Sequence, residues 1–220
     1  MSRWIEFFKP HRTIPTTTWT AKHRWDLNLQ RFIILIFGLG IFGFGDALLI
    51  QSHIGNAPWS VLAQGISFKI GINIGFATFL ISALVLLTWW PLGERPGFGT
   101  LANILIVASA IEFGVINFPK AGNFVIGIFY AFLGVALVGA GSALYITCGL
   151  GPGPRDGLMT SLHKRTGIRV GRIRLAIEAC VLSAGWVLGG RVGLGTLIFT
   201  LFIGQSVAIA LGVVSRFTSK

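Results

Sequence analysis

Residues 92–101 read LGERPGFGTL, and residues 188–197 read LGGRVGLGTL. Sliding the sequence on itself by 96 positions aligns residues 38–108 with residues 134–204 without a gap, with 25 identities in 71 positions. Nine of these identities are glycine, which glycine-rich helices share by chance, but a proline, an arginine and a tryptophan also stay in step. The alignment indicates that the chain contains two copies of one unit.

The composition is that of a membrane protein. Of the 220 residues, 53% are hydrophobic and 11% are charged, with a mean hydropathy of +0.77, whereas a soluble domain carries about 25% charged residues. About 20 apolar helical residues cross a hydrocarbon core of roughly 30 Å. Six such runs predict an all-α polytopic protein with spans at residues 32–51, 73–91, 99–118, 123–147, 173–189 and 195–214.

The net charge of +11 follows the pattern of a topology signal. Of the 18 Lys and Arg residues, six lie within residues 1–31, six lie within residues 155–174, and Arg216 and Lys220 are near the end. Basic residues flank spans on the cytoplasmic side because Lys and Arg resist transfer across the bilayer. The pattern predicts an inner-membrane protein with both termini in the cytoplasm, and it argues against nucleic acid as a partner.

We expect a basic cytoplasmic tail (1–31), a first membrane repeat (32–118), a second membrane repeat (123–214) and a short cytoplasmic tail (215–220). In each repeat a glycine-proline loop follows the first span and leads into a short helix, at 58–70 or 154–166. Such a helix reaches about 20 Å, too short to cross. Each repeat then crosses three times, and this odd number inverts the second copy relative to the first.

Total charge does not decide whether the short helices are re-entrant, interfacial or spanning. Six crossings or eight both leave 15 Lys and Arg residues inside and three outside. Equivalent positions discriminate better, since Arg155, Lys164 and Arg169 of the second copy match uncharged residues of the first. This difference favours opposite sides of the membrane for the two loops, and so an inverted repeat.

Three stretches also indicate a family. Residues 53–67 read HIGNAPWSVLAQGIS, residues 149–160 read GLGPGPRDGLMT and residues 191–196 read RVGLGT. Together they resemble the YczE-like branch of the YitT-type bacterial integral membrane proteins, over about residues 32–214. The resemblance implies a multi-pass bacterial inner-membrane protein, described as a transporter candidate without a settled substrate. Ser60 departs from the family's GPWD form, in which an acid stands at that place.

The two loops supply the candidate substrate site. Glycine permits a sharp turn, proline suits the first turn of a helix, and a helix start attracts anions through its free N–H groups. Ser60 and Asp156 could instead cap these helices, so plain helix-start punctuation is the alternative. The candidate residues are Gly55, Pro58, Trp59, Ser60, Gly151, Pro154, Arg155 and Asp156.

Three acids lie within apolar runs, where a carboxylate is costly and usually faces protein or water. Glu178 follows Arg174 by four residues, so a local ion pair explains it. Asp46 and Glu112 both lie about 20 Å from the cytoplasmic ends of their spans, counted at 1.5 Å per residue. They are either a coupling pair for protons or buried acids that bond to neighbouring spans.

An inverted repeat with interrupted helices is the architecture of many secondary transporters. The sequence has no motif for a metal, a catalytic nucleophile or a phosphate loop, so we expect no enzyme activity, metal or cofactor. The favoured function is secondary transport of a small solute, with an anion as one candidate. The alternatives are a non-transporting regulatory partner and a lipid-handling protein. The expected partners are the lipid bilayer and the solute, and assembly with further copies of the chain is left open.

Overall fold

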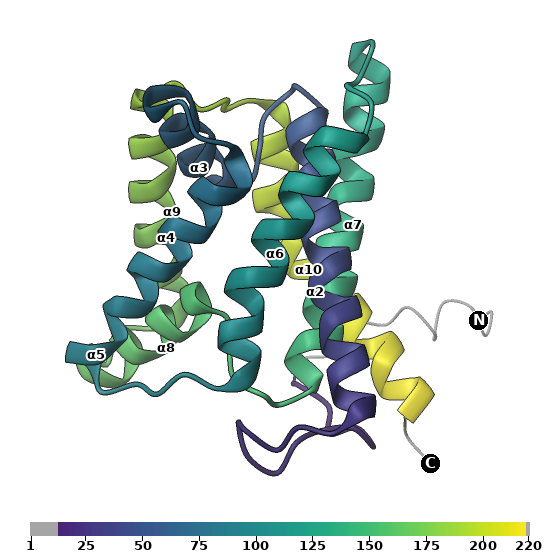
Figure 1. Cartoon of the computed structure of the whole chain (residues 1–220), viewed down its shortest axis with the longest axis vertical. Coiled ribbons are helices and arrows are strands. Elements are labelled where there is room, and N and C mark those ends of the chain that lie inside the picture. Colours follow the sequence, from purple (N-terminus) through teal and green to yellow (C-terminus); the bar gives the residue numbers. More distant parts are fainter. Residues whose placement is uncertain (1–12, 219–220) are drawn as a thin grey trace.

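The computed structural model describes residues 13–218 (Figure 1). Every regular element in this part of the chain is a helix, which confirms the all-α class. The predicted tail residues Arg3, Lys9, Arg12 and Lys220 lie outside the described residues. The helices are α2 (Leu29–Gln51), α3 (Pro58–Ile70), α4 (Ile74–Leu87), α5 (Trp89–Leu92), α6 (Phe98–Asn117), α7 (Phe124–Thr147), α8 (Pro154–Thr166), α9 (Val170–Val187) and α10 (Leu194–Thr218).

Five of the six predicted spans are helical segments long and apolar enough to cross a membrane, namely α2, Ile74–Leu92 (α4 with α5), α6, α7 and α10. The sixth, at 173–189, falls on α9 and does not reach this standard. The helix is too polar, because its 18 residues include three charged ones, Arg172, Arg174 and Glu178. The short helices α3 and α8 begin and end at the predicted residues.

Asparagine begins three of the long helices. Asn28, Asn73 and Asn123 each accept a hydrogen bond through Oδ1 from the backbone N–H three residues later, at 2.8, 2.7 and 2.9 Å. These N-cap bonds satisfy amides that have no partner in the first helical turn. The short helices begin differently, with proline in the first turn and no side-chain cap. Their first free amides are therefore left for other partners.

The backbone repeats as the sequence does. Eight described residues have a positive φ, a region that residues other than glycine rarely adopt. They form four pairs whose members are 96 residues apart: His53 and Gly149, Gly55 and Gly151, Gly71 and Gly167, Gly93 and Gly189. In Figure 1 the matched short helices lie at opposite ends of the molecule, α3 at the top and α8 at the bottom.

The helices form two bundles that stand side by side in Figure 1. In the core bundle, α2 packs against α6 and α7, and α7 packs against α10. In the side bundle, the short helices α3 and α8 each pack against both α4 and α9. A contact between α4 and α6 joins the bundles. Each bundle therefore draws equally on the two repeats.

Glycines let the first helices of the two repeats approach closely. A Cβ on Gly45 would lie 2.7 Å from the carbonyl oxygen of Gly134, and a Cβ on Gly38 would lie 3.1 Å from that of Gly141. A shift of 96 residues turns Gly38 into Gly134 and Gly45 into Gly141, so it converts one contact into the other. The two contacts between α2 and α7 are therefore equivalent under the repeat.

Each glycine-proline loop is bound by the last helix of the other repeat. The amide of Gly195 donates to the carbonyl oxygen of Ile54 at 2.9 Å, and the amide of Gly99 donates to that of Leu150 at 2.8 Å. A Cβ on Gly195 would run into the carbonyl group of Gly55, so only glycine permits this approach. We call these two places the upper clasp and the lower clasp, after their ends in Figure 1.

The segment before α2 packs beneath the lower clasp. Trp19 Nε1 donates to Thr147 Oγ1 at 3.2 Å, which attaches the segment to the end of α7. Glu94 forms ion pairs with Arg24 at 2.8 Å and with Lys164 of α8 at 2.9 Å. Glu94 therefore ties this segment to the side bundle. The described part of the predicted tail is thus folded against the helices.

Alanine at Gly55 or Gly151 should destabilise the protein. The φ angles there are +124° and +112°, and the new Cβ atoms would lie 2.6 Å from the Gly193 amide nitrogen and 2.8 Å from Thr100 Oγ1. We expect each change to lower the free energy of unfolding by about 1–3 kcal/mol, measured by thermal unfolding in detergent. Gly171→Ala is the control, because nothing lies within 4 Å of its Cβ position. Equal behaviour of all three variants would contradict the role of the clasps.

Stability should depend on pH through Glu94. Its hydrogen bonds with Lys164 and Arg24 hold the pKa of its carboxyl below the ordinary value. Because the folded-state pKa is lowered, the stabilisation is complete above the unfolded value of about 4.3 and is lost as the pH falls through the folded value. Between pH 6 and pH 3, unfolding temperatures should therefore fall more for the wild type than for Glu94→Gln. Parallel curves would show that the ion pairs contribute nothing.

Candidate functional site

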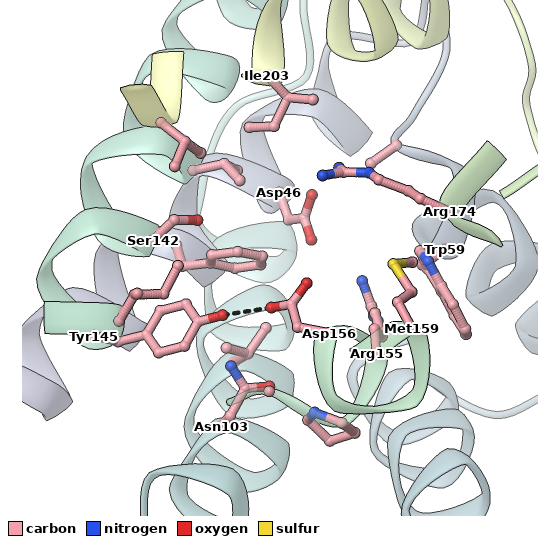
Figure 2. Close-up of a pocket in the computed structure, with 18 of the residues that line it drawn as sticks. Asp46, Trp59, Asn103, Ser142, Tyr145, Arg155, Asp156, Met159, Arg174 and Ile203 are labelled. Carbon is pink, nitrogen blue, oxygen red and sulfur yellow. Dashed lines mark hydrogen bonds between the residues drawn. The ribbon is translucent and has the colours of Figure 1, made fainter. Parts of the chain in front are cut away.

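A cavity of about 340 Å³ lies between the two bundles. The four helices of the core bundle and the four of the side bundle all contribute to its wall (Figure 2). Its lining combines apolar residues with three acids and two arginines. The charged and aromatic lining residues are Asp46, Trp59, Tyr145, Arg155, Asp156, Arg174 and Glu178, with Phe42 and Phe199.

Both repeats line the cavity. Much of its wall consists of residues that are 96 positions apart and are therefore equivalent in the two repeats. Both repeats thus line the cavity with the same part of the unit. In most of the polar pairs only one copy is charged. The equivalent lining pairs are Phe42 and Val138, Asp46 and Ser142, Ala57 and Gly153, Trp59 and Arg155, Ser82 and Glu178, Asn103 and Phe199, and Val107 and Ile203.

The residues that follow the two repeated prolines meet in the cavity. The guanidinium of Arg155 stacks over the ring of Trp59, with its central carbon 4.9 Å from the ring centroid. Stacking of this kind is a cation–π attraction, which strengthens when water is excluded. Proline sets the start of each short helix and so aims the next residue inward. The arginine is thereby held without consuming its hydrogen-bond donors.

Asp156 faces the opposite wall of the cavity. Its Oδ2 accepts a hydrogen bond of 2.7 Å from the hydroxyl of Tyr145 on α7, the bond that is dashed in Figure 2. Asp156 was predicted as a possible cap of α8 and Ser60 as a possible cap of α3, but neither helix has a side-chain cap bond. The capping prediction is therefore wrong, since Ser60 Oγ has no partner within the described residues and Asp156 accepts its hydrogen bond from Tyr145 instead.

Asp46 is the most deeply buried charged residue of the cavity. Its side chain is 1% exposed, and its Oδ1 has no hydrogen-bond partner within the described residues. The Oγ of Ser60, 2% exposed, likewise has no partner there. The polar groups nearest to the carboxylate of Asp46 are the guanidinium of Arg155 and the hydroxyl of Ser60, but neither closes a hydrogen bond with Oδ1. A buried acceptor without a donor costs about 1–3 kcal/mol or more when charged, so this site favours a bound donor.

The ion pair predicted between Arg174 and Glu178 is present, with 2.8 Å between Nε and Oε1. Sequence reasoning took this contact as a reason to set Glu178 aside, yet both residues line the cavity. Tyr145, Asn103 and Ser142 were also missed as lining residues. The repeat held a signal for some of them, since Ser142 matches Asp46 and Ser82 matches Glu178.

The other predicted site residues lie outside the cavity lining. Gly55 and Gly151 belong to the clasps and pack against Thr196 and Thr100 of the other repeat. Of the eight candidates, the lining includes Trp59, Pro154, Arg155 and Asp156, and it does not include Gly55, Pro58, Ser60 or Gly151. The predicted site is thus a mixture of wall residues and the loops that support them.

Glu112 is separated from Asp46. Its Oε2 accepts a hydrogen bond of 2.9 Å from the amide of Gly75, in the first turn of α4, and it is not part of the cavity lining. The hydrogen bond joins Glu112 to a neighbouring span, which is the arrangement that we gave as the alternative to a coupling role. Residues 13–218 contain no group of three or more His, Cys, Asp and Glu that could hold a metal ion.

Comparisons with known proteins give a family. The profile of a family of unknown function, DUF6198, matches residues 29–211. An uncharacterized protein of Haemophilus influenzae is 42% identical over 209 residues, which are 94% of this chain and 95% of that protein. The uncharacterized membrane protein YczE of Bacillus subtilis is 32% identical over 183 residues, 82% of each chain. No solved structure matches the chain.

The matched region covers the cavity and nearly all of the helices that surround it. The resemblance to YczE-like proteins, predicted from the two glycine-proline loops, is confirmed by the relative of that name. The apolar helices and this relative make the chain a multi-pass membrane protein of the DUF6198 family, with YczE-like members among its relatives.

Proposed function

We propose that this protein is a secondary transporter of a small solute in the bacterial inner membrane, with both termini in the cytoplasm. The observation that carries the proposal is a charged cavity between two bundles of an apolar helical protein, lined by equivalent positions of its two repeats. Transporters with inverted repeats bind their substrates in this kind of place, near the middle of the bilayer. A regulatory partner, which was one alternative, needs no such cavity.

The proposed topology has six spans in two inverted three-span repeats. Helix α9 would be the sixth, since its 18 residues extend about 27 Å. Of its charged residues, Arg174 and Glu178 pair with each other and face the cavity, and Arg172 lies in the first turn. Charges inside a membrane are tolerated when they face protein or a water-filled cavity. The charged α9 is thus compatible with a span.

Movement between the two bundles would give the solute access to each side in turn. The chain passes between the bundles four times, at residues 52–57, 93–97, 148–153 and 188–193. Two of these passages meet at the upper clasp and two at the lower clasp. Connections confined to two short glycine-rich places are typical of hinges. A bundle pivoting on the clasps would open the cavity at one end while it closes at the other.

Asp46 is the proposed coupling residue. The carboxylate of Asp46 is buried and its Oδ1 has no hydrogen-bond partner within the described residues. A proton or a positively charged ligand group would stabilise it, and the two would compete for it. The coupling role also predicted for Glu112 finds no support in its bond to Gly75. The proposal includes no enzyme activity and no cofactor.

The topology can be tested with two matched positions at the ends of the short helices. Lys69 and Arg165 are 96 residues apart and both are exposed. In a background with Cys148→Ala and Cys180→Ala, Lys69→Cys should react with an impermeant maleimide from the periplasm and Arg165→Cys only from the cytoplasm. Labelling of both from one side would refute the inverted repeat.

Transport can be tested in proteoliposomes loaded with a pool of bacterial metabolites, with mass spectrometry of the contents before and after incubation. We expect a small solute to equilibrate across the membrane. Arg155→Gln should slow its flux at least tenfold, a change of about 1.4 kcal/mol in free energy, because the charge beside Trp59 is lost.

Arg169→Gln is the matched control for this change, since Arg169 is exposed, lies at the start of α9 and is not in the cavity lining. It should leave the flux nearly unchanged. Equal effects of the two variants would reduce Arg155 to a topology-setting charge.

A further inference from the structure

We infer that the solute is a small zwitterion, with an ammonium group that binds between Asp46 and Asp156 and an anionic group that binds beside Arg155. This inference rests on the proposed function and names its substrate class. The cavity volume of about 340 Å³ lies at the lower end of the range of roughly 300–1,000 Å³ for small-molecule sites, which suits a small solute.

The acidic half of the site has fewer hydrogen-bond donors than its two carboxylates can accept. The side chain of Asp46 is 1% exposed, and its Oδ1 accepts no hydrogen bond within residues 13–218. Asp156 receives one donor, the hydroxyl of Tyr145. In Figure 2 the carboxylates of Asp46 and Asp156 both border the space at the centre of the cavity, with Arg155 across it. An ammonium group offers three donors and one positive charge, which would satisfy both acids at once.

The basic half lies across the same space. Arg155 stacks on Trp59, and its guanidinium makes no hydrogen bond within residues 13–218 that would occupy its donors. The starts of α3 and α8 also border the cavity, through Trp59 and Pro154, and neither start has a side-chain cap. Free amides and a guanidinium together form a site for a carboxylate or another small anion.

Charge balance selects a ligand that carries both signs. Arg174 and Glu178 neutralise each other, which leaves Asp46, Asp156 and Arg155 with a formal sum of −1. Two helix starts contribute roughly +0.5 each, so the charges of the cavity wall sum to about zero. A lone anion or a lone cation would upset this balance. A zwitterion keeps the balance and finds a partner for each end.

The test uses two series of probes that share a hydrocarbon skeleton and differ in charge. One series is phenylalanine, 2-phenylethylamine and 3-phenylpropanoate, and the other is norvaline, butylamine and pentanoate. Binding to the purified full-length protein in nanodiscs is measured by thermal shift and calorimetry. In at least one series we expect the zwitterion to bind ten times more tightly than the amine and the acid. Equal binding of a singly charged analogue, or no binding by all six probes, would overturn the inference.

Single neutralisations should change the preference in opposite directions. Asp46→Asn should weaken the zwitterion at least tenfold and favour the acid relative to the amine, whereas Arg155→Gln should favour the amine. If Asp46→Asn does not fold, Asp156→Asn gives the same test, because Asp156 is exposed to the cavity and an asparagine oxygen can still accept the Tyr145 hydroxyl. The controls are Asp26→Asn and Arg169→Gln, which lie outside the cavity lining and should leave the preference unchanged.

Preferences that move in the same direction for both neutralisations would contradict the assignment of the two ends. The outcome also separates this inference from the proposed function. A zwitterion that binds but never crosses proteoliposome membranes would reject transport and keep the ligand class. Flux of a solute that carries only one sign of charge would support transport and reject the zwitterion as the ligand class.

Discussion

Two backbone hydrogen bonds, from Gly195 to Ile54 and from Gly99 to Leu150, fix the two glycine-proline loops, and the placement of the short helices depends on them. Within a membrane, backbone that leaves the helical path must find its partners inside the protein or in a water-filled cavity. Each glycine-proline loop is such a departure, and its partner is the start of the last helix of the other repeat. The bonds hold both short helices in place, and they can form only because glycine lets two backbones touch.

The polar chemistry of the protein follows from this constraint. Once the loops are fixed, the helix starts and the residues after the two prolines face a space between the bundles. Charges that lipid would exclude are then placed where they meet one another, as Arg174 meets Glu178 and Arg155 lies near Asp46 and Asp156. The core bundle supplies one buried acid and the side bundle supplies the other charges, so the site exists only while the bundles are together.

Sequence patterns predicted the fold well where a local rule applies. The predicted bounds of α3 and α8 are confirmed, and proline stands in the first turn of each. The 96-residue repeat reappears in the positive φ angles. The site was harder to predict, because neighbours in the cavity come from distant turns. Counting residues along the helices gave similar depths for Asp46 and Glu112, but it did not give the helix faces on which they lie. For Glu178, the local ion pair was predicted correctly, but its place in the cavity wall was not. Tyr145 gave no local signal, since its partner is an acid on another helix.

The placement of Trp59 opposite Arg155 at equivalent positions also determines how a ligand can be oriented. Two identical half-sites about a twofold axis would accept an asymmetric molecule equally well in either of two opposed directions. Tryptophan in one copy and arginine in the other, with Asp46 matched by Ser142, remove that degeneracy. The two repeats therefore line a polarised cavity, in which the proposed zwitterion would have a head and a tail relative to the bilayer.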